Sequence, residues 1–320
     1  MHWREMEEMV NSGKPLGKQE AVELLQISTH SDAFYQLLAL ANRLSRTEYQ
    51  NQGYIFAQIG LNAEPCSGDC GFCSLAQSHF CVEQSYRLSK EQAVAEAVAV
   101  SRQPISDLFL MTTADYPLED YLDIGAQVRR QMPEGKRLVA NIGDFDAAQA
   151  EQLKAAGFTG VYHIHRLGEG TDTCLSPAKR LATLDAVKAA GLELYYCVEP
   201  IGPEHTPEQL ADEMLRAREY GVEVMAAMRR VPVAGTRLAY RGTITLLELT
   251  KIVAVTRLVT RPHRSMNVHE PTEMALLAGV NQLYAEYGAN PRDLRADTAA
   301  GRGLNIDRVK AMLENAEYRI

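Results

Sequence analysis

Three cysteines lie close together in one short segment, Cys66-Ser-Gly-Asp-Cys70-Gly-Phe-Cys73. Thiolates on a tight loop can hold three corners of a [4Fe–4S] cluster, because cysteine is the usual ligand of such clusters and glycine lets the chain curl around one. The fourth iron would then have no protein ligand and could bind a small molecule. A zinc site completed by Cys81 or His79 is the alternative, and the spacing alone does not exclude it. The segment therefore predicts a metal centre.

The composition is that of an ordinary globular chain: 320 residues, 46% of them hydrophobic and 23% charged, with a formal net charge of −8. An acidic chain without clustered lysine and arginine is not expected to bind nucleic acid. Six cysteines are too few for a disulfide scaffold, so we expect reduced thiols. Because no apolar run reaches membrane-spanning length and the first residues lack a signal-peptide pattern, we expect a cytoplasmic protein with no membrane partner.

The order of apolar runs along the chain predicts the fold. The first fifty residues show helical spacing, and from Tyr54 onward short apolar runs alternate with amphipathic helices, which is typical of βα units around a parallel sheet. The expected strands are Tyr54–Leu61, Asp107–Thr112, Leu138–Ile142, Gly160–His165, Leu192–Val198, Val222–Met228, His263–Val268 and Asn281–Ala285. The expected intervening helices are Lys90–Arg102, Leu118–Gln131, Asp146–Ala156, Pro177–Ala190, Pro207–Tyr220 and Thr245–Leu258.

Eight strands alternating with helices predict an α/β fold, a (βα)8 TIM-type barrel, with an open doubly wound sheet as the alternative. We expect one domain with an N-terminal helical cap (1–52), a barrel (53–288) and a short C-terminal helical cap (289–320). The cysteine segment follows the first expected strand, so it would lie at the C-terminal mouth, where such barrels build their sites. A closed structural zinc site would stabilise little there, which favours the iron–sulfur interpretation, as does the aromatic Phe72.

The C-x3-C-x2-C pattern, with an aromatic residue before the third cysteine and a preceding barrel strand, resembles the radical S-adenosylmethionine (SAM) superfamily. Within it, the chain resembles the biotin synthase-like group, which includes an iron-hydrogenase maturase and methylornithine synthase. The segments Ser12–Glu20 and Gly279–Asn281 resemble the caps of that group. The resemblance implies that Cys66, Cys70 and Cys73 hold a [4Fe–4S] cluster that binds SAM and cleaves it reductively to a 5′-deoxyadenosyl radical.

The same resemblance implies the substrate and the partners in outline. The radical would abstract hydrogen from a small or carrier-protein-bound substrate in cofactor or amino-acid biosynthesis, and a reductant such as flavodoxin or ferredoxin would supply the electron. Two alternatives stay open. One is sulfur insertion of the biotin or lipoyl type with an auxiliary cluster; the other is a non-catalytic iron–sulfur or zinc scaffold.

The residues expected to bind SAM lie at several strand ends. The resemblance places Arg180 on the SAM carboxylate, Gly202 near the adenine, and Thr112 and Thr113 near the amino group, although Met111-Thr-Thr-Ala-Asp115 departs from the usual Gly-Gly-Glu-Pro. A solvated helix charge is the alternative for Arg180. The fourth expected strand ends in a crowded polar segment, so contact with SAM or substrate is also expected there. The full expected set is Phe72, Thr112, Thr113, Arg166, Glu169, Arg180 and Gly202.

A substrate pocket is expected beside these positions. Its candidates are His163, His165, Glu199, Met228, Asn267 and His269, with the two histidines sharing one face of a strand. Cys197 falls where biotin synthase places one of three cysteines of a second cluster, and the other two are absent. Cys81, Cys174 and Cys197 could instead frame a different auxiliary iron–sulfur cluster, with ordinary free cysteines as the alternative.

Overall fold

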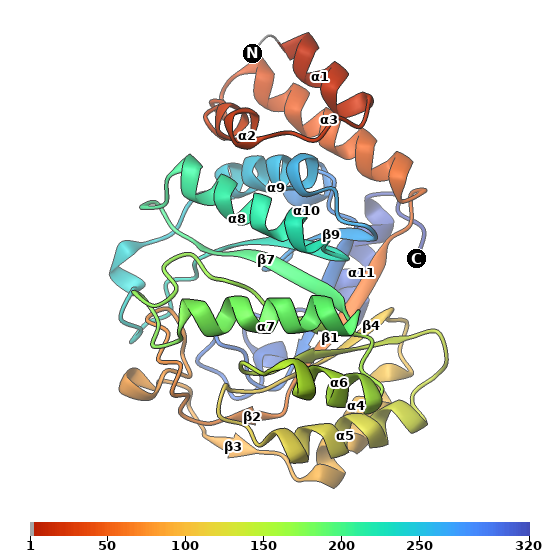
Figure 1. The fold of residues 1–320 in the computed structure, drawn as a ribbon, viewed down its shortest axis with the longest axis vertical. Helices are drawn as coiled ribbons and strands as arrows, with labels where there is room; N and C mark the ends of the chain where they lie inside the picture. The colour runs from red at the N-terminus through yellow and green to blue at the C-terminus, as the bar shows by residue number, and fades with distance from the viewer. Residues whose placement is uncertain (1–2) are drawn as a thin grey trace.

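Eight parallel strands close into a barrel in the computed structural model, which describes residues 3–320 (Figure 1). Around the barrel the order is β1-β10-β9-β8-β7-β6-β5-β4, and β1 pairs with both β10 and β4. The barrel strands are β1 (Tyr54–Gly60), β4 (Asp107–Met111), β5 (Arg137–Asn141), β6 (Gly160–Tyr162), β7 (Glu193–Ile201), β8 (Val224–Arg229), β9 (Ser265–Val268) and β10 (Gln282–Tyr287). Closure confirms the predicted TIM-type barrel and excludes the open sheet.

A helix follows every barrel strand and covers the outside of the sheet. After β1 to β10 in chain order these helices are α4 (Lys90–Ser101), α5 (Leu118–Gln131), α6 (Ala147–Ala155), α7 (Pro177–Ala190), α8 (Pro207–Tyr220), α9 (Leu246–Thr260), α10 (Glu273–Leu276) and α11 (Ile306–Asn315). The long excursion between β1 and α4 contains the cysteine segment and the two-stranded sheet of β2 (Asn62–Ala63) and β3 (Tyr86–Arg87).

Helix α7 shows how local sequence sets these boundaries. The Ser176 hydroxyl accepts a hydrogen bond from the Lys179 N–H at 3.4 Å, and Pro177 occupies the first turn, where its missing N–H has no cost. Gly191 ends the helix at φ 65°, a left-handed conformation that glycine adopts without strain. Strand β7 begins two residues later, so the sequence positions both the strand and the polar loop that precedes the helix.

Three further helices lie at one end of the molecule, α1 (Trp3–Asn11), α2 (Lys18–Leu25) and α3 (Asp32–Glu48) (Figure 1). Helix α2 packs against α8, and α3 packs against α9. Buried Arg257 of α9 donates to the Ser45 hydroxyl at 2.7 Å and also pairs with Glu48, which ties α3 to the barrel. In residues 3–320 no helix combines the length and apolar character needed to cross a membrane.

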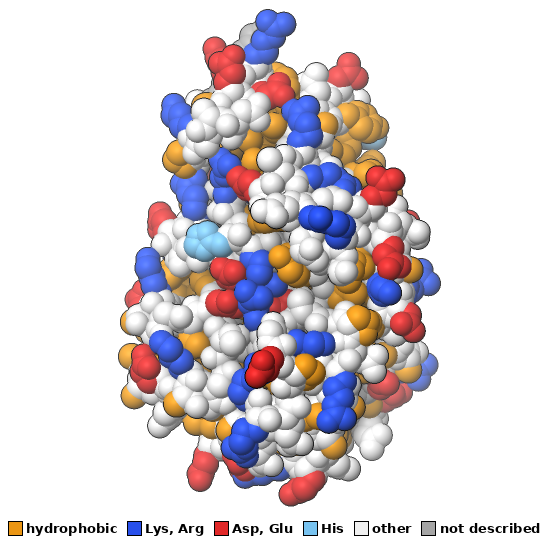
Figure 2. Space-filling view, turned by 90° about the vertical axis from the view of Figure 1, so that its right-hand side faces the viewer, with side chains coloured by type: hydrophobic (Ala, Val, Ile, Leu, Met, Phe, Trp, Pro, Cys, Tyr) orange, Lys and Arg blue, Asp and Glu red, His pale blue; other side chains and the backbone are white. Residues whose placement is uncertain are grey.

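The inside of the barrel is filled in layers. At its N-terminal end, buried Asp107 accepts hydrogen bonds from Arg264, Tyr195 and Gln282. Above them lies an aromatic and aliphatic cluster comprising Phe56, Phe109, Val139, Tyr195, Val224 and Tyr284. The layers close the bottom of the barrel and leave a hollow toward the C-terminal ends of the strands. On the face shown in Figure 2, acidic and basic side chains are interspersed.

Candidate active site

The cysteine segment forms a compact loop at the C-terminal mouth of the barrel. It begins after Gly60, the last residue of β1, where a Cβ atom would lie 2.5 Å from the Ala289 carbonyl oxygen, so the close approach of the two chains requires glycine. Within the loop, the Cys66 N–H donates to the Leu75 carbonyl at 2.8 Å, and the Cys73 N–H donates to the Cys70 carbonyl at 2.9 Å. These bonds fix the three cysteines relative to one another.

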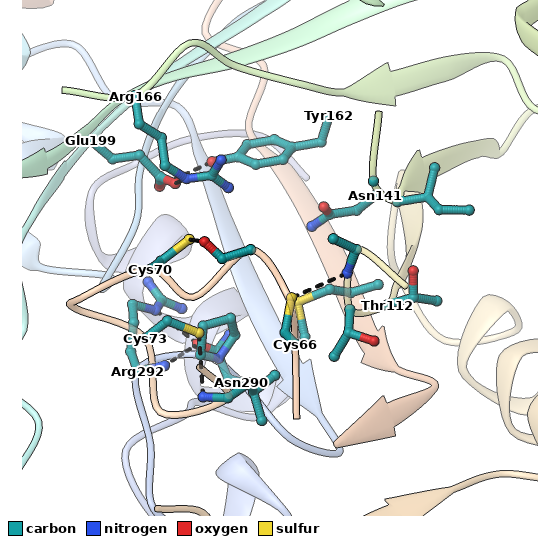
Figure 3. Close-up of a pocket in the computed structure, with 18 of the residues that line it drawn as sticks. Cys66, Cys70, Cys73, Thr112, Asn141, Tyr162, Arg166, Glu199, Asn290 and Arg292 are labelled. Atoms are coloured by element: carbon teal, nitrogen blue, oxygen red, sulfur yellow. Dashed lines mark hydrogen bonds and ion pairs between the residues drawn. The ribbon is translucent and has the colours of Figure 1, made fainter. Parts of the chain in front are cut away.

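All three thiols line one cavity (Figure 3). The Ala114 N–H donates to Cys66 Sγ at 3.4 Å, and the Leu75 N–H donates to Cys73 Sγ at 3.3 Å. Backbone donors aimed at sulfur favour thiolates, the form that binds metal. Burial raises the pKa of Cys70 to about 12 and the pKa of Cys73 also lies well above its usual value. Without a metal Cys70 and Cys73 are therefore protonated, and metal binding would displace those protons.

The arrangement fits a cluster better than a single zinc ion. Tetrahedral zinc brings its sulfur ligands to within about 3.8 Å of one another. Within residues 3–320, one group of three possible metal ligands has all its ligand atoms within 4.8 Å of one another. The loop cysteines are not part of that group, so their sulfur atoms lie further apart than a single zinc ion requires. Moreover, Cys81 Sγ faces the Ser74 carbonyl at 3.7 Å, and His79 Nδ1 contacts the Ser78 hydroxyl at 3.0 Å. Three spread thiols around a hollow match the corners of a [4Fe–4S] cluster.

The cavity measures about 1060 Å³, including the part open to solvent. Phe56 and Tyr284 form part of its apolar floor, and strand ends and loops supply its walls. Predicted residues in its lining are Cys66, Cys70, Phe72, Cys73, Thr112, Thr113, Arg166, Arg180, Glu199, Met228 and His269. The barrel therefore brings most of the predicted SAM-binding positions, and half of the predicted substrate positions, to one space.

Arg166 is the cation with unused hydrogen-bond donors in this wall. Its Nε lies 3.5 Å from Glu199, its Nη1 lies 3.6 Å from Glu169, and neither nitrogen has a hydrogen-bond partner among the described residues. Burial opposes its charge, but Glu169, Cys70 and Glu199 outweigh burial and raise the pKa of Arg166. A buried guanidinium that stays charged and has free donors is suited to bind a carboxylate.

Arg180 borders the cavity but is already engaged. It donates to the Ile164 carbonyl at 3.0 Å and to Asp144 at 2.9 Å. Glu169 lies between the two arginines, 3.5 Å from Arg180, and accepts a hydrogen bond from the Thr173 hydroxyl at 2.6 Å. Arg180 and Glu169 thus hold the loop that presents Arg166, whereas Arg166 keeps donors for a ligand.

The two predicted threonines differ in their surroundings. Asn62 donates to the Thr113 hydroxyl at 2.8 Å, and the Thr113 N–H donates back to the Asn62 side chain at 3.0 Å. The buried Thr112 hydroxyl has no hydrogen-bond partner in the described part of the chain, although it lines the cavity. Thr112 is therefore the member of the pair with capacity for a bound ligand.

Glu199 is ionised inside the cavity wall. Burial alone would raise its pKa, but His269, 3.8 Å away, and the charge of Arg166 overcome that cost and lower the pKa to about 2. The Tyr162 hydroxyl also donates to Glu199 at 3.1 Å. Burial lowers the pKa of His269, so its imidazole is neutral at physiological pH. The wall therefore presents a carboxylate, a neutral imidazole and a guanidinium side by side.

Three predicted residues lie away from the cavity. His163 is 1% exposed and packs beside Asp144 at 3.4 Å, while His165 pairs with Glu213 of α8 at 2.9 Å. Side chains alternate between the two faces of a strand, which explains the position of both histidines. Tyr162 faces the cavity, so His163 and His165, one and three residues later, face the surrounding helices. Gly202 lies against the Arg230–Glu204 ion pair, where a Cβ atom would be 2.3 Å from either partner. None of the three residues belongs to the lining of this cavity, and their contact with SAM or substrate stays a prediction.

The auxiliary-cluster candidates are placed in different surroundings. Cys174 is exposed, Cys81 is half-buried against Gly235, and Cys197 is fully buried inside the barrel. Cys197 is grouped with Glu199 and His269, and that group contains neither of the other two cysteines. Asn267 faces the same interior on β9, below His269, and is fully buried.

Sequence reasoning missed the contribution of the segment after β10. Arg292 and Asn290 line the cavity, where Arg292 donates to Glu286 at 2.5 Å and to Met228 Sδ at 3.2 Å. The segment was expected only as part of a terminal cap. Its position directly after the eighth barrel strand was the available signal, since loops at that end of every strand build the mouth. Sequence reasoning also missed Tyr162 and Asn141, which line the cavity from the ends of β6 and β5.

Known proteins resemble this chain in sequence and in fold. No family model matches the chain. The biotin synthase of Desulforudis audaxviator is 30% identical over 317 residues, which cover 93% of this chain and 92% of that protein. The chain belongs to the biotin synthase-like family of radical SAM enzymes. The biotin synthase of Heliobacterium modesticaldum is 26% identical over 80% of each chain.

Two solved structures of biotin synthase-like proteins show the same architecture. Methylornithine synthase (PylB) superposes with a TM-score of 0.82 at 18% identity, covering 98% of this chain and 96% of that one. The hydrogenase maturase HydG of Carboxydothermus hydrogenoformans gives 0.79 at 16% identity, covering 98% and 78%. The predicted membership of this family is confirmed. Biotin synthase-like enzymes use a [4Fe–4S] cluster and SAM, which agrees with the donor set of the cysteine loop.

Proposed function

We propose that this chain is a radical SAM enzyme in which Cys66, Cys70 and Cys73 hold a [4Fe–4S] cluster, and that it removes a hydrogen atom from a small organic substrate. When bound and reduced, the cluster with SAM supplies a 5′-deoxyadenosyl radical. The observation that carries the proposal is the convergence of the three thiols on one cavity at the mouth of the barrel.

The residues around the thiols have separable tasks in this proposal. Arg166 binds a carboxylate, of SAM or of the substrate, through the two nitrogens that have no hydrogen-bond partner among the described residues. Thr112 offers its hydroxyl to a polar group in the same cavity, and Phe72 packs beside the cysteines. Glu169 and Arg180 act as positioning residues, because their contacts hold the loop around Arg166.

The barrel would also exclude water from the reacting carbon. Phe56 and Tyr284 close the floor with stacked rings 5.0 Å apart, and Leu75, Leu175 and Pro291 add apolar surface at the mouth. A dry, rigid site protects a reactive species from side reactions and holds the reacting atoms in line. We propose that residues 1–52 and 289–320 cap this barrel, residues 53–288, within one domain.

The partners follow from the same chemistry. A small substrate, free or on a carrier protein, would enter through the mouth, and a reductant such as flavodoxin or ferredoxin would supply one electron. We place the substrate in cofactor or amino-acid biosynthesis. Sulfur insertion is not favoured, because the eight barrel strands contribute one cysteine, Cys197, toward the second cluster that such a reaction would need.

The test is the formation of 5′-deoxyadenosine by the anaerobically reconstituted protein with SAM and dithionite. The proposal predicts about four irons and four sulfides per chain and measurable deoxyadenosine. Cys73→Ala should lose most of the iron and all of the product, whereas Cys174→Ala, at an exposed position, should keep both. A fully loaded protein that makes no deoxyadenosine, or one that takes zinc in place of iron at the loop, would overturn the proposal.

A further inference from the structure

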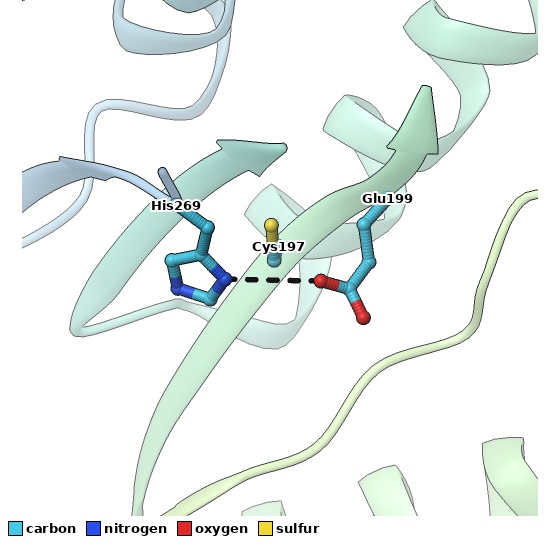
Figure 4. A group of neighbouring side chains, drawn as sticks. All are labelled: Cys197, Glu199 and His269. Carbon is cyan, nitrogen blue, oxygen red and sulfur yellow. Dashed lines mark ion pairs between the residues drawn. The ribbon is translucent and has the colours of Figure 1, made fainter. Parts of the chain in front are cut away.

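A second set of metal-binding side chains lies deeper in the barrel than the cysteine loop. The ligand atoms of Cys197, Glu199 and His269 all lie within 4.8 Å of one another, and His269 Nδ1 is 3.8 Å from Glu199 Oε2 (Figure 4). Cys197 is fully buried, and the side chains of Glu199 and His269 are 9% and 14% exposed. One thiol, one carboxylate and one imidazole therefore converge at the wall of the cavity.

Strand geometry explains why these three residues meet. Cys197 and Glu199 are two residues apart on β7, so both face the interior of the barrel, as Tyr195 does below them. His269 follows β9, which is separated from β7 by β8 alone. Cys197 pairs with Ala226 and Ala226 pairs with Asn267, so a small alanine side chain lies between the two sides of the group.

Asn267 provides an independent indication that something is bound here. It lies two residues before His269 on the same inner face of β9 and is 0% exposed. Neither its amide oxygen nor its amide nitrogen has a hydrogen-bond partner among the described residues. Burying both ends of an amide without partners costs free energy, so such a group indicates an additional ligand or its solvent shell.

The three donors match one divalent transition-metal ion. Thiolate, imidazole and carboxylate are the ligand types that zinc accepts, and catalytic zinc sites use three protein ligands and keep the fourth position open. Four-coordinate geometry places nitrogen and oxygen ligands about 3.3 Å apart, so His269 and Glu199 need to approach by about half an ångström. A cluster of several irons is a poor match, because the barrel strands supply no second thiol.

We propose that Cys197, Glu199 and His269 bind a single divalent transition-metal ion, zinc(II) or iron(II), whose open coordination position faces the cavity. Asn267 lies beside the ion, and Tyr162 holds Glu199 in place by donating to it at 3.1 Å. One thiolate and one carboxylate together balance the two charges of a divalent ion, and Glu169 balances the charge of the neighbouring Arg166.

The consequence for the reaction rests on the proposed function, whereas the metal site itself does not. An ion on the β7–β9 wall lies on the cavity shared with the cysteine loop, because Glu199, His269 and the three loop cysteines all line it. A substrate with a sulfur, nitrogen or carboxylate donor could bind this ion and be held in place for hydrogen abstraction. Such a substrate would be selected by its donor atom as well as by its shape.

The first measurement is the metal content of the anaerobically reconstituted protein after loading with stoichiometric zinc(II) or iron(II) and desalting. We expect about one zinc, or a fifth iron, beyond the four irons of the loop. Cys197→Ala and His269→Ala should each lower retention of this ion at least tenfold and keep the four irons. Cys81→Ala is the matched control, since its thiol lies outside the group, and it should retain the ion.

Zinc X-ray absorption then identifies the ligands without interference from iron. The proposal predicts one sulfur at about 2.3 Å and two or three nitrogen or oxygen ligands at about 2.0–2.1 Å. Three sulfur ligands would place the zinc in the cysteine loop and overturn the proposal. Binding of two additional irons with sulfide would also overturn it. So would retention of the zinc by both Cys197→Ala and His269→Ala, or a failure of the wild type to retain it. Deoxyadenosine formation, assayed in parallel, reports separately on the proposed radical reaction.

Where the alanine variants fail to fold, Cys197→Ser and His269→Gln keep the size and polarity of the two side chains. Wild-type circular dichroism and four retained irons establish that each variant is folded. Both substitutions should still lower zinc retention, because a hydroxyl and an amide are weaker ligands than thiolate and imidazole. Undiminished retention in folded variants would contradict the assignment.

Discussion

Arg166 and Glu199 lie 3.5 Å apart in the cavity wall, Arg166 in the loop after β6 and Glu199 near the end of β7. The pair brings opposite charges together without using all of the guanidinium donors (Figure 3). The contact is longer than a direct charged hydrogen bond, so a ligand carboxylate can compete for Arg166. The wall can therefore bind a ligand that carries both a positive and a negative charge, or a ligand carboxylate that takes the place of Glu199 beside Arg166.

The first prediction concerns Arg166. Arg166→Gln should weaken SAM binding about tenfold to a hundredfold, because charge-assisted hydrogen bonds contribute about 1.5–3 kcal/mol. Equilibrium dialysis of SAM against the reconstituted protein measures this, with iron content as the check on loading. Arg216→Gln is the matched control, since Arg216 is partly exposed on α8 and pairs with Glu213 at 3.2 Å. Equal affinities for wild type and Arg166→Gln would show that Arg166 does not bind SAM.

A second prediction tests the polar layer at the bottom of the barrel. Asp107→Ala should lower the free energy of unfolding by about 3–5 kcal/mol, because it removes the hydrogen-bonded carboxylate of the buried Arg264 guanidinium and leaves it only the carboxylate of Glu223, at 3.7 Å. Denaturant unfolding measures the change. Glu193→Gln, a partly exposed residue paired with Arg137 at 3.0 Å, should cost less than about 1 kcal/mol. Comparable losses for the two variants would contradict the structural role given to Asp107.

A third prediction asks whether Gly202 has a structural role or a role in binding SAM. An alanine methyl group would displace the Arg230–Glu204 ion pair, so Gly202→Ala should cost about 1–3 kcal/mol of stability. Because the glycine lies outside the cavity lining, the affinity for SAM should stay within about twofold of wild type. Thermal unfolding and SAM dialysis measure the two effects. A large loss of SAM affinity in a stable variant would instead support contact with the adenine.

The sequence was sufficient for the barrel because its pattern is repeated. Each strand is a short apolar run with a helix after it, and caps such as Ser176 and Gly191 mark the boundaries. The location of the metal loop followed from the same order, since a loop after the first strand of a barrel must lie at its mouth. Such inferences depend on element type alone and tolerate errors of a residue or two.

Individual cavity residues required a register that the pattern does not provide. A shift of one position reverses the direction of every side chain in a strand, and this moved His163 and His165 to the helix-facing side and left Tyr162 in the cavity. The position of Arg292 could not be predicted, because it lies in a loop whose path depends on contacts with Met228 and Glu286. Pairings of this kind join residues far apart in the chain, and no local pattern encodes them.

The last prediction concerns pH and the Arg292–Glu286 pair at 2.5 Å. Burial raises the pKa of Glu286, and Arg292 partly offsets that rise. A carboxyl whose folded pKa lies above its unfolded value favours folding at low pH and costs stability as pH rises through that window. Arg292→Leu removes the offset, so it should lower the melting temperature by roughly 5 °C at pH 8 and by clearly less at pH 5, where Glu286 is more fully protonated.

Thermal unfolding of the reconstituted protein at the two pH values, at one scan rate, measures this dependence. Arg295→Leu is the matched control, because Arg295 is 60% exposed and its pair with Glu83 is at the surface. That variant should change the melting temperature little at either pH. A deficit of Arg292→Leu that is equal at both pH values would show that Arg292 acts by packing against Met228 rather than by holding the charge of Glu286 in the barrel.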